Sequence, residues 1–367
     1  MNLRIPGPTP CPEDVLLAGA QQMIDHRGPE FAEIIDRVHS GLQTIFSTKN
    51  DVAILTSSGT GAMEGAIVNT LSPGDRVMNV SIGVFGDRFG QIAEAYGAEV
   101  VKPHTEFGTA ADPDMVSSML ADDPGIKAVL VTHNETSTGV TNDIASISKV
   151  VRSHDRLLLV DAISSVGCIP METDAWDLDV VVTGSQKGFM VPPGLAFAAV
   201  GPRAREAAKT ATMPRFYFDF EKAFSYFQQG QTPFTPAVSV IFSLDLAIRK
   251  LLDDGMEAVY TKHAKIASDV RTGVKELGLE LFPKDEATAS NTVTAVKVPE
   301  GVDLAKLRGL LRTDRNVVVA GGQGSLSGKI FRVGHMGHIT EDDVADVMES
   351  LAAVLPRAGF PVGASAG

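Results

Sequence analysis

Two stretches of this sequence decide the fold: LLLVDAISS (Leu157–Ser165) and VVVTGSQKG (Val180–Gly188). Each begins with a run of aliphatic residues, which is typical of a strand buried on both faces of a parallel sheet. A charged residue follows each run, Asp161 in the first stretch and Lys187 in the second. Because ligands of open α/β sheets bind beyond the carboxyl ends of the strands, we expect both side chains in one crevice.

A carboxylate and an amine in the same dry pocket suit pyridoxal phosphate. This cofactor needs a lysine for its Schiff base and an acidic partner for its pyridine nitrogen. A simpler interpretation is a buried ion pair between Asp161 and Lys187 that only ties two strands together. The rest of the chain favours the cofactor site.

The composition limits the class of protein and its partners. The 367 residues suggest a large and a small domain, and 44% hydrophobic with 21% charged residues is typical of a globular protein. The formal net charge of −13 argues against nucleic acid or an anionic membrane as the main partner. Cys11 and Cys168 indicate neither a disulfide framework nor a zinc site. With no signal peptide and no apolar run long enough for a membrane span, we expect a cytoplasmic protein.

Strand-like and helical segments alternate between about residues 50 and 200. This alternation predicts an α/β fold, with a mostly parallel sheet between layers of helices. After Asp253–Gly255 the order of elements changes to that of a smaller α+β domain. We predict an extended N-terminal segment (1–15), a large cofactor-binding domain (16–254) and a small C-terminal domain (255–367). The final residues, PVGASAG, are expected to fray.

A glycine-rich turn, TSSGTG (Thr56–Gly61), follows the strand-like VAIL and opens a helical stretch. Such a turn offers backbone N–H groups and the positive end of a helix dipole to a phosphate. It is not a dinucleotide fingerprint, because Glu64 stands where the third glycine is required, and no P-loop lysine follows. Alone it could equally be a structural tight turn, but before a strand-borne Asp and Lys it indicates a phosphate cup.

Several motifs identify a family when they are taken together and in order. They are SSGTGAME, GVFGDR, VTHNETSTG, LLLVDAISS, GSQKGFMVPPG, TPFTPAVS and FRVGHMG. By these motifs the chain resembles the class V (fold type I) pyridoxal-phosphate-dependent aminotransferases of the alanine–glyoxylate and serine–glyoxylate group. The resemblance covers nearly the full length, from PGPTP to the final helix, and the ordered set is far more specific than any one motif.

The resemblance implies a role for each matching residue at the cofactor ring. Lys187 matches the lysine that forms the Schiff base and then moves the proton, and Asp161 matches the partner of the pyridine nitrogen. Phe85 matches the aromatic residue that stacks on the ring, where many relatives carry Trp or His; otherwise it is a core phenylalanine. Thr136 matches a hydroxyl residue near the phenolic oxygen of the cofactor; otherwise it is a turn threonine.

The resemblance also implies how the phosphate and a second subunit would be held. Thr232 and Thr235 match positions that reach the phosphate of the neighbouring subunit, which implies a homodimer with the active site at the interface. Relatives often carry Tyr or His at the first of these positions, so the shorter Thr232 departs from the pattern. The phosphate ligands implied within one chain are Ser58, Gly59, Thr60 and Gln186.

Arg332 stands in KIFRVGHMG, where an apolar strand has no other reason to carry a cation. A guanidinium pairs with a carboxylate through two parallel hydrogen bonds, and the resemblance implies that Arg332 binds the α-carboxylate of the substrate. The alternative is a strand arginine that extends to solvent. His335 and His338 do not make a convincing metal site, and His133 fits a loop histidine, so no metal is expected.

Transamination is the function that the resemblance implies. A small amino acid, alanine or serine, would donate its amino group, and a small 2-oxo acid, glyoxylate or pyruvate, would accept it in a ping-pong cycle. Same-fold alternatives are a transaminase for aminoethylphosphonate, pyridoxamine or ureidoglycine, and a lyase or cysteine desulfurase, for which Cys11 and Cys168 are misplaced. A third alternative is a non-catalytic, hydrogenase-associated protein, against which Lys187, Asp161 and Arg332 argue together.

Overall fold

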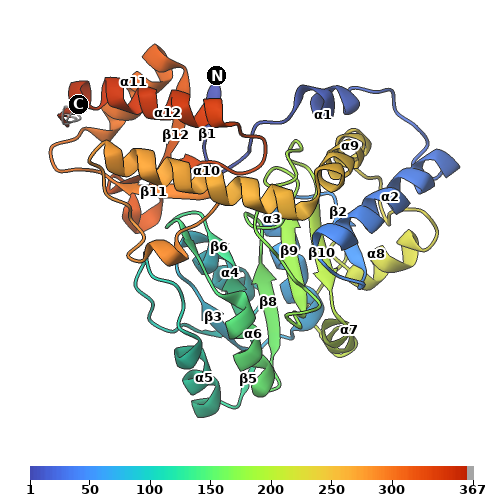
Figure 1. Cartoon of the computed structure of the whole chain (residues 1–367). Coiled ribbons are helices and arrows are strands. Elements are labelled where there is room, and N and C mark those ends of the chain that lie inside the picture. Colours follow the sequence, from blue (N-terminus) through green and yellow to red (C-terminus); the bar gives the residue numbers. More distant parts are fainter. Residues whose placement is uncertain (362–367) are drawn as a thin grey trace.

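The computed structural model describes residues 1–361, which contain two main β-sheets (Figure 1). The larger sheet is formed by β2 (Val52–Leu55), β3 (Arg76–Val80), β4 (Glu99–Val101), β5 (Ile126–Thr132), β8 (Leu157–Asp161), β9 (Val180–Gly184) and β10 (Ala196–Val200). Its strand order is β2-β10-β9-β8-β5-β3-β4. Neighbouring strands are parallel except β10, which runs antiparallel to β2 and β9. The predicted α/β fold with a mostly parallel sheet is confirmed.

Helices cover both faces of this sheet, as predicted. One face carries α2 (Pro29–Ile45), α5 (Pro113–Asp122), α6 (Ile144–Ser153) and α9 (Val238–Asp254), and the other α3 (Gly59–Thr70), α4 (Val84–Ala95), α7 (Pro202–Ala208) and α8 (Phe220–Phe227). Alternate strand residues face opposite layers: in β5, Val129 belongs to the first core and Leu130 to the second. Because both faces of the sheet are buried, its strands appear in the sequence as uninterrupted apolar runs.

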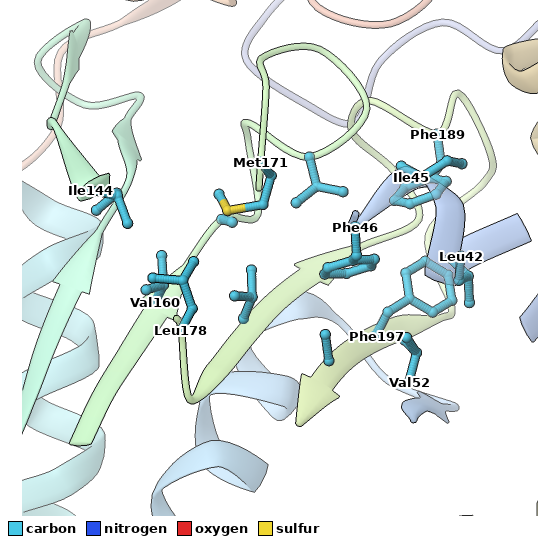
Figure 2. Packing of buried hydrophobic residues seen from close by; sticks show 14 of the residues in the cluster. Leu42, Ile45, Phe46, Val52, Ile144, Val160, Met171, Leu178, Phe189 and Phe197 are labelled. Carbon is cyan, nitrogen blue, oxygen red and sulfur yellow. The ribbon is translucent and has the colours of Figure 1, made fainter. Parts of the chain in front are cut away.

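The core reaches up to the loop that carries Lys187, between β9 and β10. Figure 2 shows Phe189 and Phe197 packed together near Phe46 and Val52. The Phe189 and Phe197 rings meet edge to face with centroids 5.1 Å apart, and both side chains are fully buried. Burying such a side chain contributes about 1.5–3 kcal/mol. Phe189 therefore anchors the loop two residues beyond the lysine.

The smaller sheet combines the first strand of the chain with three strands from its C-terminal part. It consists of β1 (Asn2–Arg4), β12 (Val317–Gly321), β13 (Ile330–Gly334) and β11 (Val293–Lys297), in that order. Around a separate core it packs with α10 (Met256–Glu276), α11 (Leu304–Arg315) and α12 (Glu341–Val354). This is the expected α+β unit. The N-terminal segment, predicted to be extended over residues 1–15, differs in two respects: β1 pairs with β12 in parallel, and helix α1 (Glu13–Ala18) begins before the segment ends.

The helices α9 and α10 meet at Gly255, whose φ of +81° suits glycine, and this is where the sequence places the boundary between domains. The division into three segments stays a prediction. No helix within residues 1–361 is long and apolar enough to cross a membrane. Apart from Pro361, the predicted frayed tail lies outside the described residues. The remaining elements are α1 (Glu13–Ala18), the hairpin β6 (Asn134–Glu135) and β7 (Val140–Thr141), and 3-10 turns at Glu286–Thr288, Gly324–Leu326 and Pro356–Ala358.

Candidate active site

A cavity of about 200 Å³ lies at the carboxyl ends of β8 and β9. It is the crevice that the two opening stretches of sequence predict, since Asp161 ends β8 and Lys187 follows β9. The structure brings most of the predicted site residues into its wall. The residues that line it are Gly7, Ser58, Gly59, Thr60, Phe85, Arg88, Asn134, Thr136, Asp161, Ile163, Ser164, Gln186 and Lys187.

The Lys187 amine is placed against the N-terminal segment of the chain. Its Nζ donates to the carbonyl oxygen of Pro6, and Thr9 Oγ1 donates to the Lys187 carbonyl oxygen at 3.1 Å. Burial lowers the pKa of Lys187 to about 8, an effect that Asp161 opposes and that Arg332 and Arg88 reinforce. At neutral pH a useful fraction of the amine is therefore neutral, as a nucleophile or proton acceptor must be.

Asp161 lines the cavity and is 2% exposed. Its Oδ1 accepts from the Ile163 N–H at 2.9 Å, and its Oδ2 from Thr132 Oγ1 at 3.2 Å. Burial, with a smaller contribution from Glu135, raises the pKa of Asp161 to about 7. A cation at this position would favour the carboxylate. A protonated pyridine nitrogen is such a cation, so the site fits the cofactor ring.

The N-terminus of α3 forms a cradle that fits a phosphate. Ser58 precedes the helix, and no side chain caps it there. A Cβ on Gly59 would come within 2.6 Å of the Ile163 side chain, which would have to shift, so glycine eases the approach of the backbone to the cavity. Opposite, the buried Oε1 of Gln186 has no hydrogen-bond partner. Because an amide flip exchanges oxygen and nitrogen, this group is free to donate to a phosphate oxygen.

Two residues without an individual role in the sequence analysis hold the Phe85 ring. The N–H groups of Phe85 and Gly86 donate to Glu135 Oε2 at 3.1 and 3.0 Å. The Arg88 guanidinium stacks over the Phe85 ring, 4.8 Å from its centroid. Both residues stand inside motifs that carry the family resemblance, GVFGDR and VTHNETSTG, so their motif membership was the available signal. A buried acid in a turn, such as Glu135, is a further signal only once the fold is known.

Arg332 lies behind the cavity wall and is 4% exposed, so it does not extend to solvent. Its Nε and Nη2 donate to the Gly321 carbonyl oxygen at 2.9 and 2.8 Å, and its Nη1 donates to the Thr136 carbonyl oxygen at 2.8 Å. Of the five N–H donors of an arginine, these bonds use three. One donor on Nη1 and one on Nη2 remain, which is the pair that a carboxylate needs.

Thr232 and Thr235 do not line the cavity of their own chain. Thr232 Oγ1 donates to the Phe234 carbonyl oxygen at 2.8 Å, and the Thr232 carbonyl oxygen accepts from Arg27 at 2.8 Å. Thr235 is exposed. Their predicted role toward the phosphate of a second chain stays a prediction.

The three histidines considered in the sequence analysis do not line the cavity. His335 bonds Thr294 Oγ1 at 2.9 Å, and burial lowers its pKa to about 3. His133 packs edge-on against Trp176 with a pKa lowered to about 4 by burial, while His338 is exposed. Within residues 1–361, no group of three or more His, Cys, Asp and Glu side chains is arranged to hold a metal ion.

The fold and the cavity define a pyridoxal-phosphate-dependent enzyme of fold type I. A lysine and an aspartate meet at the ends of adjacent parallel strands, opposite a helix N-terminus open to a phosphate. The chain belongs to the class-V aminotransferases, whose family model matches residues 6–346.

Similar proteins cover nearly the whole chain. A soluble hydrogenase small subunit from Synechococcus sp. (strain PCC 6716) is 43% identical over 362 residues, 98% of this chain and 94% of that protein. An L-aspartate–glyoxylate aminotransferase from Paracoccus denitrificans (strain Pd 1222) is 37% identical over 363 residues, 98% and 92% of the two chains. The structure of an alanine–glyoxylate aminotransferase from Nostoc sp. superposes with a TM-score of 0.93 at 29% identity, covering 96% of this chain and 94% of that one.

Proposed function

We propose that this aminotransferase moves an amino group from a small amino acid, alanine or serine, to a small 2-oxo acid, glyoxylate or pyruvate. The observation that carries the proposal is the cavity that holds Lys187, Asp161 and the α3 N-terminus together. The alanine donor and glyoxylate acceptor named for the Nostoc enzyme agree with this choice.

Bound pyridoxal phosphate supplies the electron sink for the negative charge that develops at the substrate Cα when its proton leaves. Lys187 would take that proton on Nζ and deliver it to the C4′ carbon of the cofactor, for which a pKa of about 8 is well matched near neutral pH. Asp161 would hold the ring nitrogen in its protonated form from a water-excluded position. Phe85 would give the ring a flat apolar face.

The substrate carboxylate would bind to the two unused donors of Arg332. Because the amino donor and the oxo acceptor share an α-carboxylate, one arginine would orient both in the two halves of a ping-pong cycle. The carbonyl oxygens of Gly321 and Thr136 hold the guanidinium plane fixed. The preformed orientation reduces the entropy cost of binding.

A homodimer is the assembly that we propose. Phe216 is 73% exposed and Tyr217 42% exposed, and Tyr217 stacks on Phe234 with ring centroids 5.0 Å apart. Tyr217 and Phe234 line one hollow together with Thr232, and Thr235 follows Phe234 in the chain, so aromatic rings adjoin the two residues that are expected to reach a partner's phosphate. The free thiols of Cys11 and Cys168 suit the reducing cytoplasm that we also propose.

A desulfurase is disfavoured by the cysteines. Burial raises the pKa of Cys168 to about 12, so its thiolate is scarce at neutral pH, and burial also raises the pKa of Cys11. Neither sulfur lines the cavity. A nucleophilic thiolate at the substrate is what that chemistry requires.

One experiment tests the substrates. The purified protein, loaded with pyridoxal phosphate, is assayed with alanine, serine, aspartate, aminoethylphosphonate, pyridoxamine and ureidoglycine against glyoxylate, pyruvate and 2-oxoglutarate. We expect the highest kcat/KM for alanine or serine with glyoxylate or pyruvate. A preference for aspartate or for one of the other donors would refute the substrate assignment. A bound cofactor should give a visible absorbance that borohydride treatment abolishes. A protein that lacks this absorbance would instead support the non-catalytic alternative.

A further inference from the structure

Arg88 is a cation in the cavity wall to which no role has been assigned. It belongs to the first turns of α4, with its side chain directed at the α3 N-terminus, where Arg88 Nη1 lies 3.4 Å from Thr60 Oγ1. No carboxylate within residues 1–361 forms an ion pair with it. A cation that faces a ligand cavity without a counter-charge is suited to an anionic ligand.

Two anionic groups could bind in this cavity, a substrate carboxylate and a phosphate, and the position of Arg88 indicates which of them it would meet. The substrate carboxylate is expected at Arg332, which is held by Gly321 and Thr136 from the smaller sheet and the β6–β7 turn. Arg88 is next to Thr60, in the first turn of α3, where the open N–H groups of the helix and the amide of Gln186 meet. A phosphate in that cradle would lie within reach of a guanidinium.

Phe85 fixes the orientation of Arg88. The guanidinium lies over the ring, 4.8 Å from its centroid. The backbone N–H groups of Phe85 and Gly86 donate to Glu135 Oε2 at 3.1 and 3.0 Å, which fixes the backbone that carries the ring. A stacked guanidinium keeps its N–H donors at its edge, where they remain available to a second partner. The cation is therefore pre-organised toward the cradle.

A phosphate dianion also needs more positive charge than the helix N-terminus and the amide of Gln186 supply. A helix N-terminus contributes roughly half an elementary charge, and the amide of Gln186 contributes none. Lys187 cannot serve, because its amine is required for the covalent bond to the cofactor. Among the residues that line the cavity, Arg88 is the remaining cation.

We propose that Arg88 is the counter-charge of the cofactor phosphate and that it couples phosphate binding to the position of the Phe85 ring. The inference rests on the cofactor site and not on the identity of the substrates. It makes Arg88 a cofactor-binding residue that discriminates pyridoxal phosphate from pyridoxal.

The test measures cofactor affinity with and without the phosphate. Cofactor-free wild type, Arg88→Gln and Arg88→Lys are titrated with pyridoxal phosphate and with pyridoxal, and binding is followed by visible absorbance. For Arg88→Gln we expect the Kd of pyridoxal phosphate to rise about tenfold or more, as when a charge-assisted hydrogen bond is lost, and that of pyridoxal to change less than about twofold. Arg88→Lys keeps the charge without the planar fork and should lie between.

Two controls make the result specific. Arg249→Gln removes the same charge from the exposed outer side of α9, and should leave both affinities unchanged. Inorganic phosphate should compete with pyridoxal phosphate in the wild type and less strongly in Arg88→Gln. The competition in the wild type can be measured whether or not the variant folds.

The possible outcomes are distinct. An equal loss of affinity for both cofactor forms would make Arg88 only a support for Phe85, and would overturn the inference. An unchanged affinity, together with a raised KM for aspartate but not for alanine, would place a substrate group at Arg88 and also overturn it. A wild-type chain that binds no cofactor would refute the proposed function itself.

Discussion

Replacing Arg332 by lysine separates carboxylate recognition from cofactor chemistry. The three hydrogen bonds to Gly321 and Thr136 leave the arginine two donors for a substrate carboxylate. Lysine has three donors on one nitrogen, so it cannot hold both carbonyl groups and also present two parallel donors. Loss of one charge-assisted hydrogen bond costs about 1.5–3 kcal/mol, so we expect kcat/KM to fall roughly 10- to 100-fold for donor and acceptor alike.

The assay measures each half-reaction separately by the change in cofactor absorbance. The spectrum of the resting holoenzyme should not change, and an amine without a carboxylate should react as before. Arg308→Lys, at an exposed neighbour that donates to the Val319 carbonyl oxygen, is the matched control and should be silent. If amines with and without a carboxylate lose activity equally, Arg332 is a structural strand residue and the substrate's cation lies elsewhere.

Four further predictions test the site and the assembly. Lys187→Ala should give a folded protein without covalently bound cofactor and with negligible transamination; near-normal turnover would overturn the assignment of the lysine. Asp161→Asn should retain cofactor but slow the chemical step about 100-fold in single-turnover assays at saturating cofactor, and recovery of the full rate there would contradict its role at the ring nitrogen. Since burial raises the pKa of Asp161 from 3.8 to about 7, the folded cofactor-free chain keeps a proton that the unfolded chain releases. Its stability in urea should therefore fall as pH rises through this interval, and Asp161→Asn should flatten the decline. Phe216→Glu should convert a dimer into monomers in analytical ultracentrifugation, whereas a dimer that persists would place the interface elsewhere.

Much of the fold could be predicted because local patterns determine it. The aliphatic runs that open LLLVDAISS and VVVTGSQKG are the parallel neighbours β8 and β9. The antiparallel direction of β10 could not be read from its residues, because an apolar run buried on both faces looks the same in either direction. The pairing of β1 with β12 joins segments more than 300 residues apart, and nothing local to either segment encodes it.

Some residues of the site could likewise be predicted from the sequence, whereas others depend on the tertiary structure. Lys187 and Asp161 were predictable because a charge at the end of a buried strand is costly unless a ligand or a counter-charge meets it there. Arg88 and Glu135 were not assigned roles, because a charged residue in a turn or on a helix is usually solvated, and only the tertiary structure turns these two inward. The two free donors of Arg332 depend on which carbonyl groups meet it, and that requires the packed structure.

The path of the first nine residues has a consequence for biosynthesis. Asn2 pairs with Val317. The Pro6 carbonyl oxygen accepts from the Lys187 amine, and Thr9 Oγ1 donates to the Lys187 carbonyl oxygen. The strands of the larger sheet, which end at Val200, can pair on the ribosome before β12, the partner of β1, has been synthesised. The segment that borders the Lys187 amine is therefore synthesised before the strands of the larger sheet, but it reaches its place only after β12, which follows them in the chain. A nascent chain can build its core long before its active site is complete.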